Sequence, residues 1–316
     1  MAFTNSTKGG FSFTKVVHHT PYPAISPSRP ELSQVGKTVL ITGGSSGIGL
    51  AAARAFAQAR AERVIIVGRR VELLDRAVSQ LKTDNPKVQI RGQVCDVGDA
   101  GSVERLWTML EKEGVFVDVV VLSAARFAGL NPIATSGLDV IWDDYTTNVR
   151  GHVDFAQRLY KQPNPTRRGT ALVNVSTKAI YDYSSDGLAN LIPLYSASKS
   201  AAAMLLQMLA KDVDPDEMQV VSFHPGGVFT EAVSSYGFYE DDFDWDDANM
   251  PGQFAVWAAS PEARFLHGRF VWAGWDVQEL QQGPLRKRIE EDQYFLKVGI
   301  AGLREWERAR VLSEET

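Results

Sequence analysis

The segment TGGSSGIG, residues 42–49, organises the whole N-terminal half of the chain. A short apolar run, residues 38–41, precedes it, and an Ala-rich run follows at once. Glycines at this spacing let the backbone turn tightly and approach a phosphate without Cβ clashes. The first turn of a following helix presents free N–H groups and the positive end of its dipole. The segment therefore predicts a strand–turn–helix unit that binds a dinucleotide.

Outward from this unit, short β-branched runs alternate with Ala- and Leu-rich runs. We expect strands at residues 38–41, 63–67, 88–94, 118–122, 171–175, 219–223 and 269–272. Helices are expected at residues 48–60, 71–82, 102–113, 148–160 and 196–212. Several of the strands are nearly continuous apolar runs, which is typical of parallel strands covered on both faces. The pattern predicts an α/β fold: one Rossmann-type, doubly wound parallel sheet with helices on both faces.

The chain divides into three segments around this sheet. Residues 1–36 contain four prolines between positions 21 and 30, which cannot all lie inside a helix or a central strand. We expect either an extended arm anchored by aromatic residues such as Phe13 and Tyr22, or a mobile tail. Residues 37–275 form the predicted catalytic domain, and residues 276–316 a helical C-terminal extension packed on it.

Composition excludes several classes of protein. Of 316 residues, 44% are hydrophobic and 22% charged, which is enough apolar material for a core. A net charge of −5 argues against a nucleic-acid binder. The lone cysteine, Cys95, excludes an intrachain disulfide and a Cys-based zinc site. No apolar run approaches the ~20 residues of a membrane span, and no secretory signal is evident, so we expect a cytoplasmic protein.

The second strand ends in Gly68-Arg69-Arg70, where dinucleotide folds that prefer NAD place an acidic residue. A carboxylate would repel a ribose 2′-phosphate, whereas a guanidinium pairs with it. The sequence thus predicts NADP(H) as the cofactor, with Arg69 as the main contact. The alternative is that both arginines form a solvated helix start.

A tyrosine and a lysine lie one helical turn apart at Tyr195 and Lys199, where an Ala-rich helix is expected. A nearby ammonium stabilises a phenolate and lowers the pKa of the tyrosine. Such a phenol can exchange a proton with a carbonyl or an alcohol. The pair follows a strand that ends in Asn174-Val175-Ser176-Thr177.

With these motifs in place, residues 37–275 resemble the short-chain dehydrogenases/reductases. The resemblance rests on residues 42–49 as the TGxxxGxG turn and on Tyr195 and Lys199 as the YxxxK pair. Asn148 matches the family's helical asparagine, Asp96-Val97 the pair near the adenine, and Pro225-Gly226 the motif after the sixth strand. The arm and the Trp-rich C-terminal end resemble fungal members associated with secondary metabolism.

The resemblance implies a role for each matched residue. Tyr195 would donate the proton in carbonyl reduction, Lys199 would lower its pKa and bind the nicotinamide ribose, and Asn148 would hold a water. Thr230 would contact the nicotinamide carboxamide. The implied cofactor contacts are Thr42, Gly43, Ser45, Ser46, Gly47, Ile48, Gly49, Arg69, Arg70, Asp96, Val97, Ser123, Ala124, Ala125, Asn148, Tyr195, Lys199, Pro225, Gly226, Val228 and Thr230.

The chain departs from the family pattern in three places. Thr177 stands where a catalytic serine is usual, so Thr177 is the first choice for the substrate-polarising hydroxyl, followed by Ser176, with Ser184 and Ser185 in a longer connection to Tyr195. Residues 122–125 read LSAA in place of an Asn-Asn-Ala-Gly turn, which removes amide hydrogen bonds. Residues 240–247 are rich in carboxylates; we interpret them as a solvated, mobile lid and expect no metal.

These observations favour an NADP(H)-dependent enzyme that transfers hydride between nicotinamide and a ketone or secondary alcohol of a bulky apolar or aromatic small molecule. A homodimer or homotetramer is implied, with no nucleic-acid or membrane partner. One alternative is a non-redox or net-neutral reaction on the same scaffold. A second is a non-catalytic protein that senses NADP.

Overall fold

The computed structural model describes residues 12–164, 168–184, 188–235 and 237–300. Within them, seven strands form one sheet in the order β3-β2-β1-β4-β5-β6-β7, and every neighbouring pair is parallel. The strands are β1 Thr38–Thr42, β2 Arg63–Gly68, β3 Gln89–Val94, β4 Val119–Leu122, β5 Thr170–Val175, β6 Met218–His224 and β7 Arg269–Trp272. The predicted doubly wound sheet is confirmed, and each expected strand lies within about one residue of its observed bounds.

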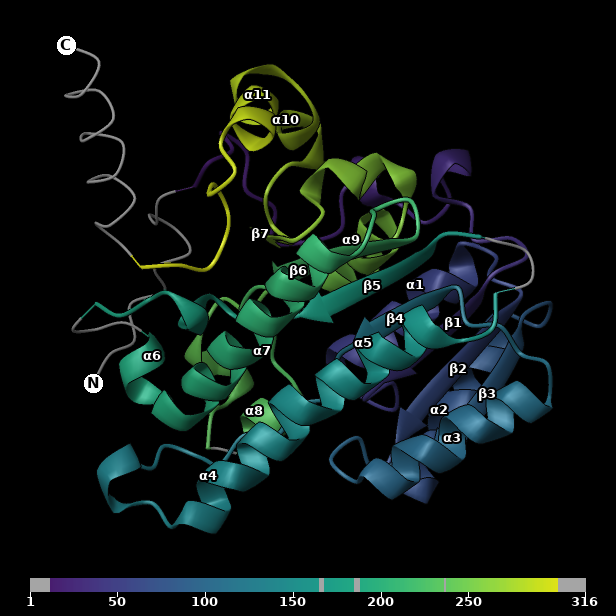
Figure 1. Ribbon diagram of the computed structural model, residues 1–316, viewed down its shortest axis with the longest axis horizontal. Helices are drawn as coiled ribbons and strands as arrows, with labels where there is room; N and C mark the ends of the chain where they lie inside the picture. Colours follow the sequence, from purple (N-terminus) through teal and green to yellow (C-terminus); the bar gives the residue numbers. More distant parts are fainter. Residues whose placement is uncertain (1–11, 165–167, 185–187, 236, 301–316) are drawn as a thin grey trace.

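Helices cover both faces of the sheet (Figure 1). One face packs against α1 Gly47–Gln58, α2 Val71–Asp84 and α9 Asn249–Ala258, through side chains such as Phe56 and Phe254. The other packs against α3 Ala100–Lys112, α5 His152–Lys161 and α7 Pro193–Asp212. Strands β1, β5 and β6 are buried along their whole length because they lie between these two layers, which explains why apolar residues predominate in them.

Two long elements differ from the sequence-based expectation. The helix expected to begin at Asn148 is preceded by α4 Leu138–Tyr145, and a π-helical turn, Thr146–Gly151, joins α4 to α5. Helix α9 lies in a region for which no helix was expected. The shorter elements are 3-10 turns at Ile133–Thr135, Lys178–Ile180, Glu240–Asp242 and Pro261–Leu266, and helices α6 Leu188–Leu191, α8 Glu231–Ser234, α10 Val277–Gln281 and α11 Gly283–Glu291.

The arm, residues 12–36, packs against the body of the protein. It contains 3-10 turns at Pro23–Ile25 and Pro30–Leu32, each beginning with proline at its first position, and Ile25 and Leu32 are fully buried in the α1/α9 core. Val17 forms an antiparallel bridge with Trp275, just after β7. Figure 1 shows the arm running beside α10 and α11, so both ends of the described chain lie at the β7 edge of the sheet.

Across the described ranges, no helix combines the length and the apolar character that crossing a membrane requires.

Candidate active site

The carboxyl ends of the central parallel strands meet at one edge of the sheet, and the residues singled out by the sequence follow those ends. The glycine-rich turn follows β1, and Ser123 follows β4. Thr177 and Pro225 come just after β5 and β6. Strand order reverses between β1 and β4, the point at which ligands bind in open α/β sheets.

The turn between β1 and α1 is fixed by backbone packing. A Cβ on Gly49 would lie 2.2 Å from the carbonyl oxygen of Gly43, so only glycine fits there. Ser46 occupies the N-cap position of α1, and its side chain makes no capping hydrogen bond. The first N–H groups of α1 are therefore left for another acceptor, as in helix termini that bind phosphate.

Thr42 joins this turn to the segment after β4. Its hydroxyl oxygen accepts hydrogen bonds from the backbone N–H groups of Ser123 and Ala124, both at 3.0 Å. On the other side, Nε2 of His152 lies 3.0 Å from the carbonyl oxygen of Ala124. Burial, with a smaller effect from the Lys199 charge, lowers the pKa of His152 to about 3, so its ring is neutral. These bonds hold the backbone of the LSAA segment, residues 122–125, in which no side-chain amide is present.

Helix α7 brings Tyr195 and Lys199 onto one face, one turn apart. Lys199 is 1% exposed, and its ammonium donates a 2.7 Å hydrogen bond to the carbonyl oxygen of Val175, the last residue of β5. Burial lowers the pKa of Lys199 to about 7. Tyr195 is half-buried, and its ring packs edge-on against Phe127, with the centroids 5.6 Å apart.

The hydroxyl groups considered for substrate polarisation differ in their surroundings. Ser176 and Thr177 come directly after Val175 and are 3% and 7% exposed. The Thr177 hydroxyl accepts a hydrogen bond from the N–H of Ala179, whereas the Ser176 hydroxyl is buried without a partner among the described residues. Ser184 lies on an exposed turn and donates to Asp182. Ser185 lies outside the described residues.

Asn148 lies in the π-helical turn and is fully buried. Its side-chain oxygen accepts from the N–H of Arg126 at 2.8 Å, and its amide donates to the carbonyl oxygen of Arg126 and to the hydroxyl of Ser198. The side chain thus links the segment after β4 to helix α7. Protein groups already bond the oxygen and the nitrogen of this side-chain amide. A water bound at Asn148 would therefore have to bond the backbone of that residue. π-turns of this kind are frequent at functional sites.

The two arginines after β2 have different partners. Arg70 forms a bidentate ion pair with Glu231, the first residue of α8, at 2.7 and 2.9 Å. Arg69 is exposed, and no ion pair to it is found within the described ranges. Asp96 lies nearby, after β3, where its carboxylate accepts from the N–H of Gly98 and its own N–H donates to Ser102.

The turn after β6, Pro225–Gly227, is held by a distant carboxylate. Gly226 has φ +94°, and a Cβ there would lie 2.3 Å from Oδ2 of Asp246. The same oxygen accepts a 2.7 Å hydrogen bond from the N–H of Gly227, and the N–H of Asp246 donates to the carbonyl oxygen of Gly227. Asp246 is 8% exposed, and burial raises its pKa. The solvated-lid interpretation is therefore wrong for Asp246, although Asp241, Asp242 and Asp244 are exposed.

Thr230, at the end of this segment, caps α8 by accepting a hydrogen bond from Val233. A Cβ on Gly47 would lie 3.1 Å from the methyl carbon of Thr230, so the segment after β6 reaches the phosphate-binding turn. Val228, two positions before Thr230, is buried.

Among the described residues, no group of three or more His, Cys, Asp or Glu side chains could hold a metal ion.

Four residues contribute to this arrangement in ways that the sequence did not predict: Arg126, His152, Glu231 and Asp246, the last of which was assigned to a solvated lid. Their partners are 22, 28, 161 and 19 residues away. His152 follows Asn148 by four positions, so both side chains lie on one helical face. That spacing is the one local feature that could have indicated any of them.

Comparison with known proteins identifies the family. The family model described as short chain dehydrogenase matches residues 37–238. A "Short chain dehydrogenase/reductase" of Claviceps purpurea is 37% identical over 290 residues, covering 91% of this chain and 94% of the relative. "Short chain dehydrogenase/reductase nsrO" of Aspergillus novofumigatus is 34% identical over 291 residues, covering 91% and 96%.

Solved structures share the fold. A variant of actinorhodin polyketide ketoreductase, solved with NADPH, superposes with a TM-score of 0.66 at 22% identity, covering 76% of this chain and 96% of that one. The family-model match spans the phosphate-binding turn, the Tyr195–Lys199 pair and the Pro225–Gly227 turn alike. This chain therefore belongs to the short-chain dehydrogenase/reductase family, which confirms the resemblance seen in its sequence motifs.

Proposed function

We propose that this protein is an NADP(H)-dependent oxidoreductase that interconverts a ketone and a secondary alcohol on a bulky apolar or aromatic small molecule, in secondary-metabolite biosynthesis. The observation that carries the proposal is the position of Tyr195 and Lys199. They lie one turn apart on α7, with Lys199 buried and bonded to the end of β5. That edge of the sheet also carries the uncapped start of α1.

Features of the sheet edge fit a dinucleotide. The uncapped N-terminus of α1 supplies free N–H groups for a pyrophosphate, and Gly49 allows the tight backbone packing that forms the turn. Arg69 is exposed and carries a positive charge suited to a 2′-phosphate. Asp96 and Val97 would lie at the adenine, and Ser123 to Ala125 beside the ribose. Bound NADPH would supply the hydride.

The chain's own residues would handle the proton. The Tyr195 hydroxyl would donate its proton to the substrate oxygen as that oxygen gains charge. Lys199 would stabilise the resulting phenolate by its charge and hold the nicotinamide ribose. The Thr177 hydroxyl oxygen already accepts a hydrogen bond from the N–H of Ala179, which leaves its proton for donation. It would therefore donate a hydrogen bond to the same substrate oxygen. Ser176, buried and without a partner among the described residues, is the second choice.

Several observations support a bulky apolar substrate. Phe127 packs edge-on against Tyr195, so an apolar ring lies next to the reacting phenol. Tyr181 and Tyr183, in the long connection before Tyr195, are exposed. The actinorhodin ketoreductase that shares the fold acts on a polyketide by its name. The fungal relatives support, by analogy, a place in secondary metabolism.

The proposal includes a homodimer or homotetramer in the cytoplasm. Helices α5 and α7 expose large apolar side chains, Tyr160, Leu205 and Met208, which are 38–46% exposed in the single chain. These side chains would be covered if two copies of the chain paired through α5 and α7, which contact each other.

The substitution Tyr195→Phe tests the proposal. It removes the proton donor and keeps the ring that packs on Phe127, so kcat for ketone reduction should fall by about 10²- to 10⁴-fold. The Kd for NADPH, measured by nucleotide fluorescence, should change less than about threefold. The reaction is followed by NADPH absorbance against a panel of aromatic ketones and polyketide-like diketones.

Two outcomes would count against the proposal. Undiminished turnover in the Tyr195→Phe variant would remove the phenol from the mechanism. Product formation without any net consumption of NADPH would favour a net-neutral reaction on the same scaffold instead.

A further inference from the structure

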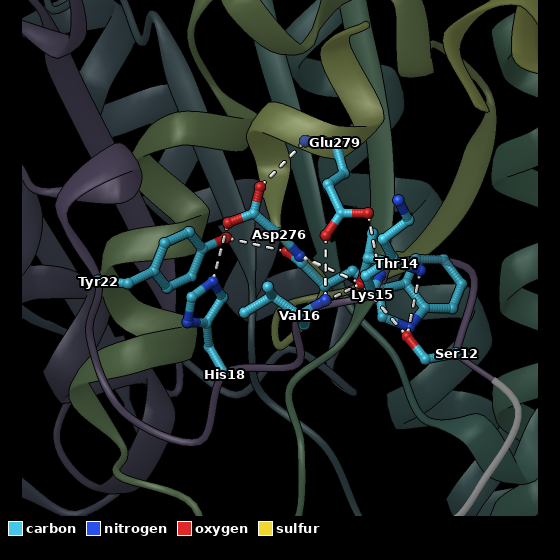
Figure 2. Close-up of polar contacts among 9 residues, drawn as sticks. Ser12, Thr14, Lys15, Val16, His18, Tyr22, Asp276 and Glu279 are labelled. Atoms are coloured by element: carbon cyan, nitrogen blue, oxygen red, sulfur yellow. Dashed lines mark hydrogen bonds and ion pairs between the residues drawn. The ribbon is translucent and has the colours of Figure 1, made fainter. Parts of the chain in front are cut away.

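The arm precedes the region matched by the family model. Along the β7 edge of the sheet it forms hydrogen bonds with the carboxylates of Asp276, at the start of α10, and Glu279, within α10 (Figure 2). The backbone N–H groups of Lys15 and Val16 donate to the carboxylate of Glu279 at 2.9 and 3.0 Å. The N–H of His18 donates to the carbonyl oxygen of Gly274 at 2.7 Å. These bonds use backbone atoms of the arm, so they hold it in place whatever its side chains are.

Two adjacent histidines of the arm then turn to different parts of the protein. Nε2 of His18 lies 2.9 Å from Oδ2 of Asp276, and its ring stacks on Tyr22 with the centroids 3.6 Å apart. Figure 2 shows this contact at the start of α10. Nδ1 of His19 lies 2.5 Å from Oδ1 of Asp246, and the carbonyl oxygen of His19 accepts from the N–H of Asp247 at 2.9 Å.

Asp246 is thereby held on both sides. One carboxylate oxygen contacts His19, and the other accepts the N–H of Gly227. An isolated buried carboxylate is expensive unless hydrogen bonds compensate for lost water. His19 supplies one of the two compensating donors. Without the His19 donor, the Asp246 carboxylate would be better solvated if it turned toward water. The N–H of Gly227 would then lose its acceptor.

We propose that His19 is a positioning residue for the active site: through Asp246, it fixes the Pro225–Gly227 turn against which the nicotinamide would lie. The part about the nicotinamide rests on the proposed function. The mechanical part, that His19 fixes the turn, does not. The turn needs such a contact because Gly226 has φ +94°, a conformation that a glycine leaves at little cost.

Three variants of the full-length protein test this role. His19→Ala removes the donor. His19→Asn keeps an N–H donor at nearly the same distance from the backbone as Nδ1. His18→Ala is the matched control, because it removes the neighbouring ring and its bond to Asp276 but leaves His19, Glu279 and the bridge between Val17 and Trp275.

The first measurement is amide hydrogen exchange of peptides that span residues 225–247, in the protein without added nucleotide. We expect these peptides to exchange about tenfold faster in His19→Ala than in the native protein, which is the factor expected for loss of one charge-assisted hydrogen bond. His19→Asn should restore most of the protection. His18→Ala should lower the melting temperature and leave these peptides within about twofold of the native rate.

The second measurement separates positioning from a general loss of stability. With NADPH and a ketone substrate, His19→Ala should lower kcat and raise the Kd for NADPH, each by about three- to tenfold. KM for the ketone should change less than about twofold. His18→Ala should leave all three constants nearly unchanged despite its lower melting temperature.

The outcomes distinguish this inference from the proposed function. Unchanged exchange at residues 225–247 in His19→Ala, or an equal effect of His18→Ala, would overturn the role of His19. Faster exchange in His19→Ala, rescued by Asn, in a protein that neither binds NADPH nor reduces a ketone would support the link from His19 to the turn and overturn the proposed function alone.

Discussion

The phosphate-binding turn after β1 and the Pro225–Gly227 turn after β6 lie at the same edge of the sheet but are fixed by different means. The first is closed by backbone atoms within eight residues, with Gly49 packed on Gly43. The second is fixed by a side chain 19 residues away, which is itself held by a histidine 227 residues away. The first turn is therefore closed by its own backbone, with Gly43 and Gly44 also packed against the neighbouring strands, whereas the second depends on a side chain distant in the sequence.

The largest effect is expected when alanine replaces a glycine in each turn. In Gly49→Ala the new Cβ would meet a backbone oxygen at 2.2 Å, which cannot move without breaking the turn. We expect the Kd for NADPH to rise more than about 100-fold, or about 3 kcal/mol. In Gly226→Ala the clash is with the Asp246 carboxylate, which can rotate away if it gives up its hydrogen bond to Gly227, and a strained φ costing about 1–2 kcal/mol remains.

Nucleotide fluorescence titration measures both affinities, and melting temperatures show whether either variant folds. The Gly226→Ala variant should lose about tenfold in affinity. Equal losses in the two variants would show that the two turns do not differ in rigidity.

A further effect is expected at the ion pair between Arg70, which follows β2, and Glu231, the first residue of α8. If Arg69 contacts the 2′-phosphate, Arg69→Ala should raise the Kd for NADPH by about 10- to 30-fold, because one charge-assisted contact is lost, and leave that for NADH unchanged. Glu231→Gln should instead lower the Kd for NADPH about two- to fivefold, because it frees Arg70. A native protein that prefers NADH would refute the assignment of both arginines.

The last test concerns Lys199, whose ammonium donates a hydrogen bond to the carbonyl oxygen of Val175 at the end of β5. Its pKa is about 7 in the folded protein, against an ordinary value of 10.5 for a solvated lysine, so the unfolded chain binds more protons between these values. Stability should therefore rise with pH over this window, by at most about 1.4 kcal/mol per pH unit. Melting curves of the native protein and Lys199→Met, without nucleotide, should diverge in favour of the native protein from pH 7 to 10. Parallel curves would mean that Lys199 is charged when buried.

Local sequence was sufficient wherever local physics determines the structure. The strands were predicted within about one residue because short runs rich in Val and Ile recur between turn and helix patterns, and such residues favour a pleated, buried strand. The conformation of the turn after β1 could be predicted because close approach of backbone atoms requires its glycines; its binding of phosphate stays a prediction.

Tertiary packing explains what the sequence did not reveal. Helix α9 contains Pro251 and Gly252, which argue against a helix, yet Gly252 is what allows α9 to pack against the backbone of Ala51 in α1. The π-turn shifts the helical phase at Asn148, so the pattern that α4 and α5 share was not continuous in sequence. The bond between His19 and Asp246 joins residues that no local pattern relates.

The docking of the arm has a consequence for biosynthesis. The arm leaves the ribosome before the sheet does, whereas its partners Asp246, Asp276 and Glu279 are among the last of the described residues to be made. The central strands can pair while the arm is still unattached, and its attachment closes a loop of more than 220 residues. Attachment of the arm is therefore a late step in folding, and a nascent chain stalled before residue 246 would carry the proposed catalytic side chains without the contact that holds the Pro225–Gly227 turn.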